Sequence, residues 1–188
     1  MRYLKNVVAN NCGLSRKISK ILDDNRSLAQ VLMGTLLLIA ASNLSVPFFP
    51  VPMTFQTFAV MLIGFLMTPK NAFFSAFAYL VAGIFAPVFN SHNFGVNYLL
   101  HGVTSGYLLA LPFAAMIFSR LKTVNLALAI FATEITIFLP GVCVLAMFLG
   151  FESALHAGFV VFIIPEFVKI ALLITAVKTK LFAVNRNK

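Results

Sequence analysis

Residues 124–149, VNLALAIFATEITIFLPGVCVLAMFL, decide the fold class of this chain. Glu134 is the one charged side chain in the run. About 20 consecutive apolar residues are enough to cross a bilayer as a helix, and core helices of soluble domains rarely reach that length without more charge. We therefore expect a membrane-spanning helix here, and the rest of the chain is interpreted outward from it.

The composition agrees with a membrane protein. Of the 188 residues, 61% are hydrophobic and 10% are charged, with a mean hydropathy of +0.97. Soluble domains carry about 25% charged residues, so a soluble globule and a disordered chain are both excluded. The length allows about six spans. We predict an all-α membrane protein with six transmembrane helices, whose apolar runs lie at about 27–45, 53–68, 71–87, 99–119, 124–149 and 158–180.

The cations are distributed unevenly. All of the 14 Lys and Arg except Lys169 lie before the first run, in the second and fourth loops, or at the end of the sixth run and beyond it. By the positive-inside rule both termini are cytoplasmic, and the chain lies in the lipid of the cytoplasmic membrane. The net charge of +9 therefore reflects topology and not a nucleic-acid partner. We divide the chain into a basic N-terminal segment (1–26), a transmembrane substrate-binding domain (27–180) and a basic tail (181–188).

Lys169 lies within the sixth run, three residues after Glu166. Residues at i and i+3 share a helix face, and charges at bilayer depth need a partner or a cavity. Two interpretations stay open. The two side chains form a buried ion pair, or both face a polar pocket. In the pocket they would suit a ligand with donors beside an acceptor, such as a cyclic urea or amide.

Two segments between the runs are unusual. Residues 46–52, VPFFPVP, contain three prolines that prevent a helix, and an apolar non-helical segment must pack on protein or line a cavity. Residues 87–106 are neutral and rich in Asn and Gly, and include Asn90. This third loop is either a solvated outer loop or folds inward over a site. Nearby aromatic residues are candidates for pocket walls: Phe48, Phe49, Phe89, Phe94 and Tyr98.

Other polar residues in the apolar runs include Gln56, Thr57 and Glu134. Glu134 lies near an interface or is linked to a proton. The three histidines share no metal-ligand spacing, so we assign no metal. The sequence has no Walker A, HExxH or GxSxG motif, so we predict no catalytic residues and no ATP hydrolysis by this chain.

Four ordered blocks resemble the BioY family, the biotin-specific substrate-capture (S) components of energy-coupling-factor (ECF) transporters. Residues 46–60, VPFFPVPMTFQTFAV, are similar to its PFTPVPITLQTLAV stretch. Residues 79–89 resemble YLxxG followed by xPVF, and residues 104–112 resemble GPTGGYLxGFP. Residues 154–169 are in register with ALxxGxxPFxPxDxxK. The resemblance extends from about residue 27 to 180.

The resemblance implies a non-enzymatic six-helix protein that encloses one biotin, with Glu166 and Lys169 at the ureido ring. It implies no cofactor, and uptake with a coupling subunit and an ATPase pair, or alone. The first loop would act as a lid through Pro47, Phe48, Phe49, Pro50 and Pro52. The further expected binding residues are Gln56, Tyr79, Asn90, Asn97, Thr104 and Tyr107.

The sequence departs from the family pattern at several positions. Glu166 replaces an Asp, and the third loop lacks the Arg that in many relatives can pair with the ligand's carboxylate. The first helix has Gly34 and Ala41 in place of the Ala-x-x-x-Ala pattern that docks the coupling subunit. Two alternatives follow: an S component for another small vitamin, or a membrane enzyme in which Glu134, Glu166 and a histidine do acid–base work.

Overall fold

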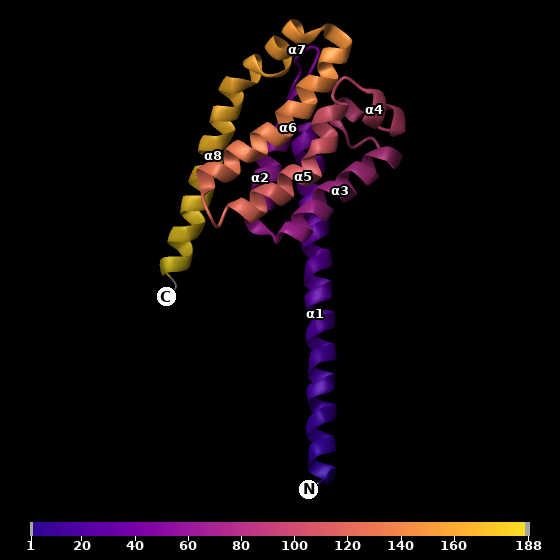
Figure 1. Cartoon of the computed structure of the whole chain (residues 1–188), viewed down its shortest axis with the longest axis vertical. Coiled ribbons are helices and arrows are strands. Elements are labelled where there is room, and N and C mark those ends of the chain that lie inside the picture. Colours follow the sequence, from indigo (N-terminus) through magenta and orange to yellow (C-terminus); the bar gives the residue numbers. More distant parts are fainter. Residues whose placement is uncertain (1, 187–188) are drawn as a thin grey trace.

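The computed structural model describes residues 2–186, and the side chains of residues 23–90 and 92–179. Within these residues the chain is mostly helical (Figure 1). The elements are α1 (Arg2–Asn43), β1 (Ser45–Val46), β2 (Met53–Thr54), α2 (Gln56–Leu66), α3 (Pro69–Phe85), η1 (Asn90–His92), α4 (Val96–His101), α5 (Ser105–Leu121), α6 (Leu126–Leu149), α7 (Phe151–Gly158), η2 (Val160–Phe162) and α8 (Ile163–Arg186).

Each of the six apolar runs contains a helix, which confirms the helical fold class. Among the described residues, two helical stretches are long and apolar enough to cross a membrane, namely Leu126–Leu149 and Phe151–Thr179. Helix α2 has 11 residues, and at about 1.5 Å per residue it is much shorter than the bilayer core. The six spans and their orientation therefore stay predictions.

The expected all-α fold contains one small hairpin. Strands β1 and β2 pair antiparallel, with Ser45 opposite Thr54 and Val46 opposite Met53. The prolines of residues 47–52 prevent a helix there, and the chain reverses direction so that α2 can pack back on α1. The second run therefore becomes helical only at Gln56, and not at residue 53 as expected.

Two other runs are also interrupted. The fourth is split into α4 and α5, because α4 ends at Gly102 in an extended backbone conformation. The sixth begins with η2, and α8 starts only at Ile163, with Pro165 in its first turn, where proline is tolerated. Both interruptions adjoin residues that line one cavity of the bundle, Thr104 and Phe162 among them.

Helix α5 is the centre of the packing and contacts α6, α3 and α2. Helix α1 passes so close to α3 at Gly34 that a side chain there would overlap Ser75. Beside it, Thr35 donates to the Ser75 carbonyl at 3.0 Å. Ala41 is also buried. Gly34 and Ala41 thus serve contacts inside the bundle and are not available as a docking face for another subunit.

Both ends of the described chain point toward the same end of the bundle, and α7 lies at the opposite end (Figure 1). Helix α1 extends beyond the bundle as a single rod and passes residue 26 without a break. The turns between α2 and α3 and between α5 and α6 lie at the end toward the termini. The predicted boundary at residue 26 is therefore not a change of secondary structure.

Candidate binding cavity

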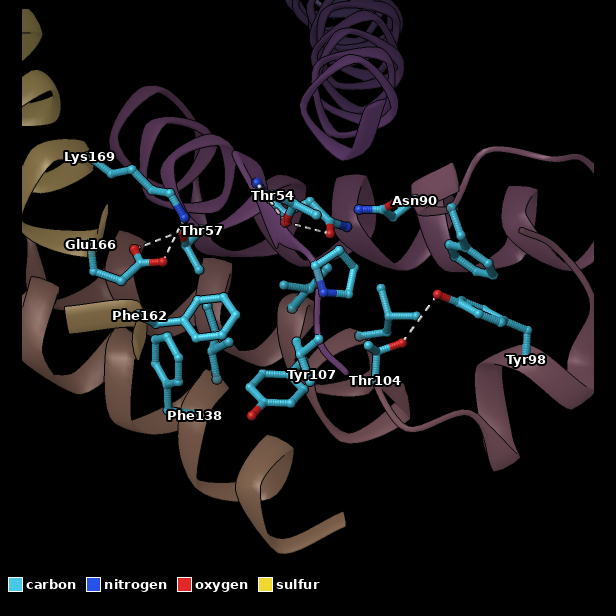
Figure 2. A pocket seen from close by; sticks show the side chains of 17 residues that line it. Thr54, Thr57, Asn90, Tyr98, Thr104, Tyr107, Phe138, Phe162, Glu166 and Lys169 are labelled. Carbon is cyan, nitrogen blue, oxygen red and sulfur yellow. Dashed lines mark hydrogen bonds and ion pairs between the residues drawn. The ribbon is translucent and has the colours of Figure 1, made fainter. Parts of the chain in front are cut away.

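A cavity lies between the hairpin, α2, α5, α6 and the start of α8 (Figure 2). A concave site lined mainly by apolar groups, with a few polar side chains among them, is typical of small-molecule binding. The lining residues are Val51, Pro52, Thr54, Gln56, Thr57, Phe89, Asn90, Tyr98, Thr104, Tyr107, Leu108, Leu111, Ile137, Phe138, Phe162, Glu166 and Lys169.

One end of the cavity is charged. Lys169 Nζ lies 2.6 Å from Glu166 Oε1, and the two residues are only 4% and 6% exposed. Thr57 joins them: its hydroxyl donates to Glu166 Oε2 at 2.9 Å and accepts from Lys169 Nζ at 3.0 Å. Glu166 is in the first turn of α8, where the helix dipole favours an anion. Both sequence interpretations therefore hold in part, because the two charges pair with each other and also face the cavity.

This group presents a carboxylate beside an ammonium at a fixed spacing. A carboxylate accepts hydrogen bonds, an ammonium donates them, and bonds to charged groups are stronger than neutral ones. The wall therefore complements a ligand that carries N–H groups next to a carbonyl. Thr57 is bonded to both partners, which holds them at this spacing.

The opposite end of the cavity is polar and uncharged, with Asn90, Tyr98 and Thr104 around it (Figure 2). The Thr104 hydroxyl donates to Tyr98 Oη at 3.4 Å. Phe89 and Asn90 are both buried, so the third loop folds inward and covers the cavity. The alternative of a fully solvated outer loop is therefore wrong at these two residues.

Gln56 is positioned by its neighbours. Thr54 Oγ1 donates to Gln56 Oε1 at 2.9 Å, and Gln56 Nε2 donates to Tyr79 Oη at 2.9 Å. Tyr79 is fully buried behind Gln56 and does not line the cavity. The expected binding residue Tyr79 is therefore a support for Gln56, since it lies one helix further from the cavity.

Aromatic rings form the apolar wall between the two ends. Tyr107 and Phe162 each pack edge-on against Phe138, with ring centroids 6.0 and 5.8 Å apart. The Tyr107 hydroxyl donates to the Gly158 carbonyl at 2.9 Å, which ties α5 to the end of α7. A side chain at Gly141 would overlap the Tyr107 ring, so glycine is required for this wall.

Several expected residues lie elsewhere. Asn97 is exposed on α4 and does not line the cavity, because α4 turns the next residue, Tyr98, inward. Phe49 is 90% exposed, and Phe48 and Phe94 are also exposed, so none of the three forms a pocket wall. Of the predicted lid residues, Pro52 lines the cavity, but Pro47, Phe48, Phe49 and Pro50 do not.

Sequence reasoning omitted Thr54, Thr57, Phe138 and Phe162 from the site. Thr57 could have been found from the sequence, because it is a polar residue next to Gln56 in an apolar run. Phe138 and Phe162 carried none, because the chain has 21 phenylalanines and most such side chains pack or face lipid.

Glu134 lines a separate apolar groove between α6 and α8, which also contacts Glu166, Phe138 and Phe162. These three residues therefore separate the groove from the cavity. Glu134 itself does not line the cavity, and neither does any described histidine. The arrangement does not assemble the acid–base group that a membrane enzyme would need.

The chain is similar to known proteins over most of its length. The model of the BioY family matches residues 15–186. A probable biotin transporter BioY of Rickettsia prowazekii (strain Madrid E) is 26% identical over 178 residues, covering 90% of this chain and 92% of that protein. A probable biotin transporter BioY of Pyrococcus horikoshii is 36% identical over 131 residues, covering 69% and 80%.

One solved structure is similar in fold. It is the S-component for biotin from an ECF-type ABC transporter, with a TM-score of 0.73 and 22% sequence identity. The match covers 84% of this chain and 91% of that one.

Proposed function

Because this chain belongs to the BioY family, we propose that it binds biotin and takes part in its uptake as the substrate-specific subunit of an ECF-type transporter. The observation that carries the proposal is the Glu166–Lys169 pair, which is buried in the cavity wall. The other described residues that line the cavity are uncharged. The named relatives are biotin transporters and not enzymes.

The two ends of the cavity differ in the same way as the two ends of biotin, one charged and one neutral and polar. The ureido N–H groups donate to Glu166 and the ureido carbonyl accepts from Lys169. The fused ring and the aliphatic chain then lie along Tyr107, Phe138 and Phe162. The carboxylate reaches the neutral end near Asn90 and Thr104, where amide and hydroxyl groups receive it in place of a cation. Among the described side chains, Lys169 is the only Lys or Arg that lines the cavity.

We infer that the chain is a multi-pass protein of the cytoplasmic membrane, with six spans and both termini in the cytoplasm. Residues 47–52 act as the lid, since Val51 and Pro52 close one side of the cavity. We propose that a coupling subunit and an ATPase pair supply the energy for transport, with uptake by this chain alone as the alternative. The chain itself has no Walker A motif. Gly34 and Ala41 do not form the contact with that subunit, because both are buried.

Calorimetric titration of the ligand-stripped protein in detergent tests the substrate. Biotin should bind one-to-one with a Kd on the order of nanomolar. Desthiobiotin keeps the ureido ring and should bind, whereas lipoic acid has a similar acid chain without a urea and should not. A folded protein that binds no biotin, but binds another vitamin such as thiamin or riboflavin, would overturn the biotin assignment in favour of a different S component.

A second measurement separates ligand recognition from a purely structural ion pair. Lys169→Met should abolish biotin binding and leave the bundle folded, because the ammonium faces the cavity. The control is the double variant Glu166→Gln/Lys169→Met, which removes both charges. If the single variant unfolds and the double variant restores folding, the pair serves mainly to neutralise itself. Circular dichroism melts and titration on the same samples distinguish the two results.

A further inference from the structure

A second groove opens between α3 and α5, away from the cavity. It is lined by Thr68, Pro69, Lys70, Phe73, Phe74, Met116 and Arg120. Its position at the α2–α3 turn and the last turn of α5 places it at the end of the bundle toward the termini (Figure 1). The groove therefore combines two cations at one end with aromatic and thioether side chains along its length.

The turn that presents Lys70 is held rigidly. Lys122 Nζ donates to the carbonyls of Gly64, Phe65 and Met67 at 2.7–2.8 Å. Ser119 Oγ donates to the Met67 carbonyl at 2.7 Å. Lys122 thus completes the end of α2 and fixes α5 to the turn. Because the turn and the end of α5 are joined in this way, Lys70 and Arg120 are held on either side of one groove.

The three cations near this groove differ in their contacts. Lys122 is engaged by backbone carbonyls, whereas Lys70 and Arg120 are exposed. Among the described side chains the one ion pair is Glu166–Lys169, so neither Lys70 nor Arg120 is in a salt bridge. Asp24 lines the adjoining α1–α3 groove together with Lys70, but no salt bridge joins the two. The charge at this groove is therefore available to an external anion.

The length of the groove is apolar. Phe73 packs edge-on against Phe74 and Phe113, with ring centroids 5.6 Å apart in each pair, and stacks on Phe77 at 6.0 Å. Phe74, Phe77 and Phe113 are each about half exposed. An aromatic surface of this kind, leading away from two cations in a membrane protein, matches a molecule with an anionic head and a hydrocarbon tail.

We propose that this groove is a binding site for one anionic phospholipid. The phosphate lies between Lys70 and Arg120, and an acyl chain lies along Phe73, Phe74 and Met116. Basic pockets between membrane helices on the cytoplasmic side recognise such head groups, and each cation near the surface contributes to the attraction. The site rests on the chain's membrane location but not on the identity of its vitamin.

The test compares phosphatidylglycerol with phosphatidylcholine. The full chain is reconstituted in nanodiscs that contain both lipids, released into mild detergent, and examined by native mass spectrometry. The wild-type protein should retain one phosphatidylglycerol. The variant Lys70→Gln/Arg120→Gln should lose it, with an apparent affinity reduced about tenfold or more. The matched control, Arg26→Gln/Lys178→Gln, removes the same charge from two exposed residues outside the groove and should retain the lipid.

Equal loss of phosphatidylglycerol in both double variants would overturn the site, because retention would then depend on net charge alone. Retention by Lys70→Gln/Arg120→Gln would also overturn it. If that variant retains the lipid but no longer co-purifies with a coupling subunit, the groove is a protein contact instead. Biotin titration on the same samples keeps the two proposals separate: a wild-type protein that retains the lipid but binds no biotin contradicts only the proposed function.

Discussion

Thr57 links the two charged residues of the cavity through one hydroxyl group. Its hydroxyl is both donor and acceptor, so it satisfies Glu166 and Lys169 at once. A buried charge that lacks a partner is costly, and a hydrogen bond to a charged group contributes about 1.5–3 kcal/mol. Thr57 therefore sets the spacing at which the acid and the lysine meet a ligand.

Thr57→Val removes the hydroxyl and keeps the shape of the side chain. We expect biotin affinity to fall about tenfold or more, because Glu166 and Lys169 lose their common partner and shift. Thr57→Ser keeps the hydroxyl and should bind within about threefold of the wild type. Titration calorimetry measures both variants. Unchanged affinity in Thr57→Val would show that the ion pair holds its geometry without this bond.

At the scale of elements, the inward fold of the third loop depends on the close approach of Phe89 to α3. The Phe89 ring is fully buried, with Tyr79 edge-on at 5.5 Å and Tyr98 stacked at 5.7 Å. A side chain at Gly83 would overlap this ring. Gly95 N also donates to the Gly83 carbonyl at 2.8 Å, so both ends of the loop segment are tied to the same turn of α3.

Gly83→Ala should push Phe89 out of its position and open the cavity at its neutral end. We expect a lower melting temperature and a biotin dissociation rate at least tenfold faster, measured by chase of bound radiolabelled biotin. Gly83→Ala/Phe89→Leu makes room for the new methyl group and should recover part of the loss. A Gly83→Ala protein with wild-type kinetics would mean that the loop does not retain the ligand.

At the scale of the whole molecule, the cations of the loops gather at one end of the bundle. Lys70, Arg120 and Lys122 lie at or beside two turns at one end of the bundle, toward both termini, and α7 lies at the other end (Figure 1). The positive-inside rule then predicts that the first end lies in the cytoplasm and that α7 lies outside. The cavity mouth near the hairpin and the third loop would face the outside, where the vitamin is captured.

Cysteine labelling in intact cells tests this orientation. In a background in which Cys12 and Cys143 are replaced by serine, Ser153→Cys on α7 should react with an impermeant maleimide. Thr123→Cys, in the α5–α6 turn, should react only after the membrane is permeabilised. Both residues are exposed, so the difference reports sidedness and not burial. The reverse pattern would invert the predicted topology.

Composition and local spacing determined the fold class of this protein, its family and one part of its site. The apolar runs predicted its helical fold, the four blocks predicted the BioY family, and the i, i+3 spacing predicted that Glu166 and Lys169 share one face of a helix. These features depend on residues close together in the chain, so sequence alone can reveal them.

The tertiary structure decided the rest. Thr57 is 109 residues from Glu166 in the sequence, and only the packing of α2 against α8 brings them together. Likewise, Tyr98 faces the cavity and Asn97 does not, because the rotation of α4 is set by its neighbours. The sequence alone did not assign a contact to Gly34, which lies against Ser75 inside the bundle. Such contacts join distant segments, and the orientation of a helix about its axis is fixed only when its neighbours are in place.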